Sequence, residues 1–215
     1  MKNRMTVKQM VLLAMLSAVA YLMVALVRIP VVLFLSYEPK DVIITIGGFL
    51  LGPMASFVIS LVVSLIEMVT ISDTGPIGAI MNLLSTCTFA CTAAFIYKKK
   101  HTAKGAVLGL LTGSVVMVAA MLLWNYLITP LYMTGTSRAD VAALLIPAFL
   151  PFNLLKAGLN SAFILVLYKP LVTALRKTGL VSSGRQGSSK VGIYIFAGLL
   201  LATCILLLLV LRVKL

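Results

Sequence analysis

The chain has 215 residues, 61% of them hydrophobic, and its mean hydropathy is +1.14. This size allows one membrane domain and leaves no room for a soluble catalytic domain beside it. The formal net charge of +13 does not indicate a nucleic-acid-binding protein, because the lysines and arginines lie between apolar segments, where the positive-inside rule places them.

The first apolar segment runs from about Val7 to Val27 and follows the basic residues Lys2, Arg4 and Lys8. This arrangement resembles a signal peptide, but the segment is too long for the hydrophobic core of one and long enough to span a bilayer. We therefore predict a retained first membrane helix.

Five further apolar segments predict helices. They run from about Asp41 to Leu51, Met54 to Ile71, Ile77 to Tyr97, Gly105 to Ile128, and from Pro147 or Pro151 to just before Pro170. The first of the five is short for a membrane span, so we expect a tilted or partial helix that its neighbours complete. A basic loop is expected over 98–104 and a longer loop over 130–146.

A Ser/Gly-rich stretch, Ser182–Ser189, and a last apolar run, Val191–Val210, follow the sixth segment. Such a composition is typical of a linker. We therefore predict an all-α membrane protein with a six-helix membrane domain over 1–178, a basic Ser/Gly-rich linker over 179–190, and an extra apolar helix within 191–215.

Most lysines and arginines lie in three segments, namely the N-terminal tail, the 98–104 loop and residues 169–190. Six helices between the N-terminus and residue 170 put all three on one side of the membrane, and the positive-inside rule identifies that side as the cytoplasm. We expect a multi-pass protein of the cell membrane with a cytoplasmic N-terminus and the loops 28–41, 72–77 and 130–147 outside. Arg212 and Lys214 also fall outside, which is a mild departure from the rule.

The loop Leu35–Asp41 lies between two apolar runs and holds two of the five acidic residues of the chain beside Lys40. Charge in so apolar a chain is costly unless it faces water, a partner or a cavity. Two interpretations stay open. The loop either recognises a ligand at the mouth of a site, with Tyr37 and Asp41 in contact with it, or is an ordinary solvated loop at the membrane surface.

Motifs for catalysis and metal binding are absent from the sequence. There is no phosphate-binding G-x-x-x-x-G-K-[ST] loop, no H-E-x-x-H and no G-x-S-x-G. The three cysteines, Cys87, Cys91 and Cys204, lie inside apolar segments and His101 is the only histidine, so neither a metal site nor a disulfide framework is expected. This pattern favours binding or transport over catalysis.

The sixth predicted helix carries Asn153, Lys156 and Asn160 at spacings of three and four, which places them on one face. Asparagine amides both donate and accept hydrogen bonds, so they can pair with the imide edge of a planar heterocycle while a lysine donates to its oxygens. The alternative is that these asparagines join neighbouring helices. A lysine in the middle of an apolar helix favours a ligand site.

The end of the fifth predicted helix lies at the same outer side. Its Asn125 is a further candidate ligand contact, and Trp124, Tyr126 and Tyr132 are candidates for the apolar walls of a small-molecule site.

Two other helices have a face with a distinctive pattern of residues. Ala14 and Ala18 in the first helix form a small-xxx-small pair, which allows another helix to approach closely in lipid. In the third helix Ser56, Ser60, Ser64 and Glu67 form a polar stripe, and we expect Glu67 to be a buried structural group rather than a catalytic one.

With these segments assigned, the chain resembles the riboflavin-specific substrate-binding (S) component of energy-coupling factor (ECF) vitamin transporters, over roughly positions 8 to 177. The motifs that carry the resemblance are Tyr37-Glu38-Pro39-Lys40-Asp41, Gly47-Gly48-Phe49-Leu50-Leu51-Gly52-Pro53, Asn125-Tyr126 with Pro130-Leu131-Tyr132, and Pro151-Phe152-Asn153-Leu154-Leu155-Lys156. The last two in combination are specific, and the others are weaker.

The resemblance implies a six-helix S-component fold that binds riboflavin near the outer surface. It implies that Asn125, Asn153 and Lys156 contact the flavin, that the loop after the first helix caps the pocket, and that Ala14 and Ala18 contact the transmembrane coupling subunit. Two cytosolic ATPase subunits would supply the energy, which fits the missing ATP motif. No cofactor is implied beyond riboflavin as the transported ligand.

The apolar run after Val191 exceeds the six-helix pattern, and the resemblance assigns it no role. Two rival functions stay open. One is an S component for another vitamin, and the other is a membrane enzyme or assembly factor that uses the same polar groups.

Overall fold

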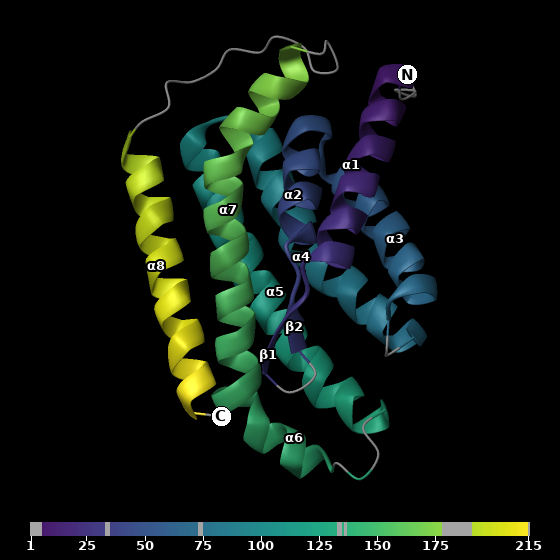
Figure 1. The fold of residues 1–215 in the computed structure, drawn as a ribbon, viewed down its shortest axis with the longest axis vertical. Helices are drawn as coiled ribbons and strands as arrows, with labels where there is room; N and C mark the ends of the chain where they lie inside the picture. Colours follow the sequence, from purple (N-terminus) through teal and green to yellow (C-terminus); the bar gives the residue numbers. More distant parts are fainter. Residues whose placement is uncertain are drawn as a thin grey trace.

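The computed structural model describes residues 6–32, 35–72, 75–132, 135, 137–177 and 191–214. The described part of the chain is an elongated helical bundle with one small hairpin (Figure 1). Its elements in chain order are α1 (Val7–Leu26), β1 (Ile29–Val32), β2 (Leu35–Tyr37), α2 (Lys40–Leu51), α3 (Pro53–Thr70), α4 (Gly75–Lys100), α5 (Ala103–Tyr132), α6 (Arg138–Leu144), a π-helical turn (Leu145–Phe149), α7 (Leu150–Lys177) and α8 (Val191–Lys214).

Five helical segments among the described residues are long and apolar enough to cross a membrane. They are Val7–Leu26, Pro53–Thr70, Gly75–Lys100, Ala103–Leu131 and Arg138–Leu175. The apolar part of α8, Ile193–Leu209, is shorter. A helix rises 1.5 Å per residue, so about 20 residues match the roughly 30 Å hydrocarbon core of a bilayer. The predicted all-helical membrane fold with an extra C-terminal apolar helix is confirmed.

The short helix α2 lies at the centre of the bundle. It contacts α1, α3, α4 and α7, and every residue from Lys40 to Phe49 is buried. Its 12 residues give a length of about 18 Å, too short to cross a bilayer unaided. It ends at Gly52, whose φ of 99° suits glycine, and Pro53 starts α3. The expected partial helix is therefore confirmed, and its charged first turn lies inside the protein.

Two predicted loops contain regular structure. The segment after α1 forms the antiparallel hairpin β1–β2, which pairs Ile29 with Tyr37. The expected loop over 130–146 is wrong in part, because it holds α6, which the Ser137 hydroxyl and the Asp140 carboxylate cap reciprocally. A polar capping pair in a short segment is easily taken for loop sequence.

Two predicted helix ends are also wrong, since α5 continues through Pro130 and α7 through Pro170. A proline removes one backbone donor and normally ends a helix in water. Inside a membrane the chain gains nothing by unwinding, because no water is available to satisfy the freed groups. The predicted linker Ser182–Ser189 lies outside the described residues.

Helices α4 and α5 approach each other closely through glycines. A Cβ atom at Gly113 would lie 2.6 Å from the carbonyl oxygen of Phe89, and one at Gly109 would lie 2.7 Å from that of Ala93. Because the obstructing atoms are backbone, neither can move aside without separating the helices. Small residues that allow close helix contact are a general feature of membrane interfaces.

We expect Gly113→Ala to lower the free energy of unfolding by about 1–3 kcal/mol, the usual cost of overpacking. Thermal denaturation of the purified protein measures this loss of stability, and we expect Tm to decrease by on the order of 5 °C. The matched control is Gly198→Ala in α8, where an added Cβ has no atom within 4 Å. Equal shifts for both variants would contradict the close-packing account.

Helix α8 packs lengthwise along α7 on the outside of the bundle (Figure 1). Its Cys204 sits over Gly158, where an added Cβ would come within 2.6 Å of the sulfur. Cys204 also joins Tyr37, Leu155 and Leu159 in a buried apolar cluster. The extra helix therefore covers the side of α7 that also supports the hairpin.

Candidate functional site

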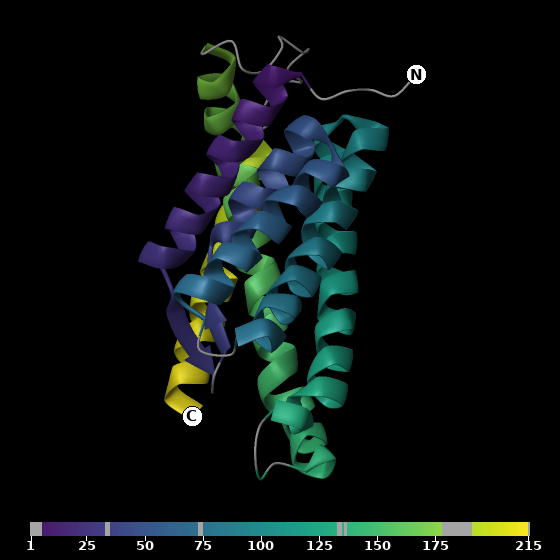
Figure 2. The ribbon, with the colours of Figure 1, turned by 90° about the vertical axis from the view of Figure 1, so that its right-hand side faces the viewer.

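A cavity opens at the end of the bundle that holds the hairpin. In Figure 2 this end lies opposite the N-terminus. The cavity has a volume of about 730 Å³, its open mouth included. Its described lining residues are Arg28, Leu35, Ser36, Glu38, Glu67, Ile71, Ser72, Met81, Asn82, Ser85, Met121, Asn125, Phe152, Asn153 and Lys156.

Lys156 enters the cavity from α7 and is held by two polar partners. Its Nζ lies 3.2 Å from Oδ2 of Asp41 and donates to the Ser85 hydroxyl at 3.3 Å. The Lys156 side chain as a whole is 7% exposed. An ammonium group has three donors, so one N–H is left to point at a ligand.

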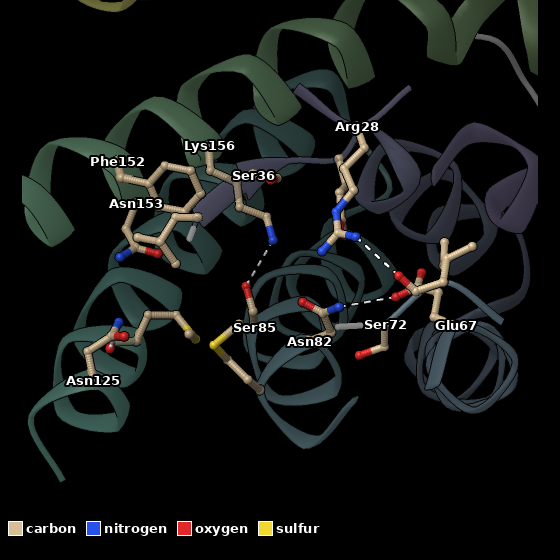
Figure 3. Close-up of a pocket in the computed structure, with 15 residues that line it drawn as sticks. Arg28, Ser36, Glu67, Ser72, Asn82, Ser85, Asn125, Phe152, Asn153 and Lys156 are labelled. Carbon is tan, nitrogen blue, oxygen red and sulfur yellow. Dashed lines mark hydrogen bonds and ion pairs between the residues drawn. The ribbon is translucent and has the colours of Figure 1, made fainter. Parts of the chain in front are cut away.

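The two predicted asparagines line the same side of the cavity (Figure 3). The Asn153 side-chain nitrogen donates to the Phe149 carbonyl at 2.7 Å, which fixes the amide and leaves its oxygen as an acceptor. The Asn125 nitrogen donates to the Met121 carbonyl at 2.7 Å, and its oxygen accepts from Thr129 at 3.1 Å. Both amides are thus held in fixed orientations before any ligand arrives.

The opposite side of the cavity is charged. Lys40, 1% exposed, lies between two carboxylates, 2.6 Å from Oε1 of Glu67 and 2.7 Å from Oε2 of Glu38. Asn82 donates to Glu67 at 3.1 Å, and Arg28 lies 3.3 Å from Glu38 at the mouth. A buried lysine is tolerated only when paired in this way. Glu67 is therefore buried and paired, as the sequence predicted, and it also lines the cavity.

The predicted contacts Tyr37 and Asp41 lie behind the cavity wall. The Tyr37 hydroxyl donates to the Asn160 amide oxygen at 3.0 Å, and the Asn160 nitrogen donates to Asp41 at 3.2 Å. Thr86 donates to the other oxygen of Asp41 at 2.6 Å. Burial, followed by the nearby Asp41 carboxylate, raises the pKa of Tyr37, so the hydroxyl stays protonated and keeps donating. In this structure the two residues connect to the cavity through Lys156, and direct ligand contact by them stays a prediction.

The charged loop fits neither of its two predicted forms completely. Glu38, Lys40 and Asp41 are all buried, so the loop is not an ordinary solvated one. The residues of this segment that reach the cavity are Leu35, Ser36 and Glu38. Sequence spacing could not separate them from their neighbours, because the hairpin that orients them was not predicted.

The aromatic residues that line the cavity also differ from the predicted ones. Neither Trp124 nor Tyr126 lines the cavity, and Tyr126 is 40% exposed on the outside of α5. The side chain of Tyr132 lies outside the described residues. Phe152 supplies a ring instead, together with Met81 and Met121. Phe152 could have been found, since it precedes Asn153 in the motif and shares the turn of α7 that enters the cavity.

The small pair of α1 does not line the cavity and faces outward. Ala14 and Ala18 are exposed, whereas Leu12, Leu13 and Leu16 are buried against the bundle. The pair is therefore accessible to a helix outside this chain.

A bundle of membrane helices around a preorganised polar cavity is typical of a membrane protein that binds a small ligand. The sequence profile described as ECF transporter, substrate-specific component, matches residues 8–168. The chain therefore belongs to the family of substrate-specific components of ECF transporters, which are substrate-binding transport subunits that associate with an ECF energising module.

Relatives of known function support this assignment. The chain is 28% identical to the riboflavin transporter RibU of Staphylococcus aureus (strain TCH60), over 79% of this chain and 93% of that one. It is 28% identical to the riboflavin transporter FmnP of Bacillus subtilis (strain 168), over 71% of this chain and 85% of that one. A solved S component of a bacterial ECF transporter superposes with a TM-score of 0.65 at 29% identity, covering 79% of this chain and 98% of that one.

Proposed function

We propose that this chain captures riboflavin and passes it across the membrane as the substrate-specific subunit of an ATP-driven ECF transporter. The observation that carries the proposal is the pair Asn153 and Lys156, which lie three residues apart on α7 and both line the cavity. The riboflavin relatives at about 28% identity support the choice of vitamin.

The two sides of the cavity fit the two parts of riboflavin. Its flavin ring carries an imide N–H flanked by two carbonyl oxygens, and the Asn153 oxygen and the free N–H of Lys156 offer the complementary acceptor and donor. Phe152, Met81 and Met121 provide the apolar contact that a ring requires. The ribityl hydroxyls match the charged side, where Arg28, Glu38 and Asn82 lie.

We propose that the cavity opens outside the cell and that the N-terminus is cytoplasmic. In Figures 1 and 2 the start of α1 and the end of α7 share one end of the bundle with the α4–α5 junction. The described lysines of that end are Lys8, Lys98, Lys99, Lys100, Lys104, Lys169 and Lys177. The positive-inside rule places such an end in the cytoplasm.

Transport in this proposal needs a transmembrane coupling subunit and two cytosolic ATPase subunits. The sequence carries no phosphate-binding loop of its own. The coupling subunit would dock on the exposed face of α1 around Ala14 and Ala18.

The test of the vitamin is direct. We expect the purified protein to carry a yellow flavin absorbance through gel filtration, and the flavin-free protein to quench riboflavin fluorescence with one site per chain. Folded protein that does not quench riboflavin but shows a thermal shift with another vitamin would assign the chain to a rival S component. A membrane enzyme or assembly factor would show neither response.

We also expect riboflavin to slow hydrogen exchange across Leu35–Asp41. Leu35, Ser36 and Glu38 line the cavity, so a bound vitamin contacts the strand directly and suppresses its opening. Hydrogen exchange followed by mass spectrometry measures it, with the α8 peptides as internal reference. Exchange in this segment that ignores riboflavin would contradict its role as a cap.

A further inference from the structure

A second hollow lies at the end of the molecule away from the vitamin cavity, between the last turns of α7 and the first turns of α8. It is an open groove of about 960 Å³, its open side included. The described residues that line it are Val166, Lys169, Pro170, Thr173, Ala174, Lys177 and Tyr194. The family match ends at residue 168, so nearly all of this groove is built by sequence outside that match.

The groove is positively charged and its charge is not neutralised within the described chain. Two of its described lining residues are lysines and none is acidic. No described residue forms an ion pair with Lys169 or Lys177. The sequence has five acidic residues. The four that the structure describes, Glu38, Asp41, Glu67 and Asp140, belong to segments at or near the other end of the bundle. The described part of the chain therefore offers these two lysines no anion.

The groove is also amphipathic along the membrane normal. Its apolar residues lie deeper in the membrane and its lysines lie nearer the surface, as the tail and headgroup of a lipid do. α7 runs outward from the membrane interior toward Lys177, so Val166 lies deepest and the two lysines lie above it, about 12 Å apart along the helix at 1.5 Å per residue. Pro170 and Ala174 give the groove an apolar floor. Tyr194 of α8 is 38% exposed and brings an aromatic ring of the kind enriched at membrane interfaces.

We propose that this groove binds an anionic glycerophospholipid, with the phosphate on Lys169 and Lys177 and an acyl chain along the apolar floor between α7 and α8. Basic pockets between membrane helices on the cytoplasmic side are typical sites for acidic headgroups. This inference rests on the proposed cytoplasmic placement of this end of the bundle and is independent of which vitamin the other cavity binds.

Native mass spectrometry of the full-length protein in detergent, titrated with phosphatidylglycerol or phosphatidylcholine, tests the site. We expect wild-type protein to retain phosphatidylglycerol preferentially. Lys169→Gln with Lys177→Gln is expected to lose about thirtyfold in affinity, since each lysine near an acidic lipid contributes roughly a fivefold factor. The matched control, Lys100→Gln with Lys104→Gln, removes the same charge from the same end outside the groove.

A second variant distinguishes lipid binding in the groove from general electrostatic attraction of lipid to this end of the protein. Ala174→Trp keeps every charge and fills the groove from an exposed position, so it is expected to displace the lipid without unfolding the helix. Equal lipid loss in the control double variant, or full retention in Ala174→Trp, would overturn the proposal. Binding of inorganic phosphate that displaces the lipid would reassign the groove to free anions. Loss of assembly with the energising module, with lipid retention unchanged, would reassign it to a protein partner.

Discussion

Replacing Lys156 with alanine is expected to weaken riboflavin binding by tenfold or more. A hydrogen bond from a charged group in a dry pocket contributes about 1.5–3 kcal/mol, and 1.4 kcal/mol is a factor of ten in affinity. Lys156 is 6% exposed and lines the cavity beside Asn153. Fluorescence quenching of riboflavin by the folded variant measures the loss. Unchanged affinity would remove Lys156 from the site.

The same substitution also leaves a buried carboxylate without one of its partners, and this effect has to be separated from lost binding. Asp41 is 1% exposed and pairs with Lys156 at 3.2 Å. Removing one member of a buried pair typically costs about 3–5 kcal/mol. The double variant Lys156→Met with Asp41→Asn removes both charges, so we expect it to recover thermal stability while riboflavin affinity stays low.

Recovery of affinity in that double variant would mean that Lys156 acts only by supporting the fold. A control for the loss of a lysine as such is Lys104→Ala, which lies at the other end of the bundle. We expect it to bind riboflavin as the wild-type protein does.

Helical periodicity predicts a buried face best where the residue spacing and the free-energy cost of exposing polar groups to lipid indicate the same face. Asn153 and Lys156 had to share a face because of their spacing, and neither is stable against lipid, so an interior position followed. The stripe from Ser56 to Glu67 is buried for the same reason. In such helices the identity of the buried face needs no tertiary information.

Contacts between distant segments could not be predicted in this way. Lys40 meets Glu67 across 27 residues, and Tyr37 meets Asn160 across 123. Nothing in the spacing of either pair selects the other member. The burial of the charged loop depends on α2 lying at the centre of the bundle, and that position follows from the packing of its neighbours rather than from its own composition.

The hairpin shows a related limit. Its strands cover only Ile29–Val32 and Leu35–Tyr37, too short for alternation to stand out beside the apolar runs. Without the hairpin, the sequence could identify the loop as important but could not select Ser36 and Glu38 over Tyr37 as the residues at the cavity.

The second large effect concerns α1. We expect the double variant Ala14→Leu with Ala18→Leu to bind riboflavin with wild-type affinity but to lose riboflavin uptake by tenfold or more. Both alanines are exposed on the outward face of α1, so we expect leucines there to leave the core of the bundle undisturbed. They would instead separate α1 from a partner helix, because contact in lipid depends on small residues that allow close approach.

Uptake and binding have to be measured on the same protein to support this expectation. Proteoliposomes that hold the chain with an ECF energising module report ATP-driven accumulation, and co-purification reports assembly. The matched control is Ala119→Leu with Ala202→Leu, two exposed alanines on α5 and α8. Full uptake by the α1 variant would refute this docking face and leave the binding proposal intact. Accumulation of riboflavin on adding ATP to proteoliposomes that hold this chain alone would refute the need for a partner, since the sequence has no phosphate-binding loop to drive it.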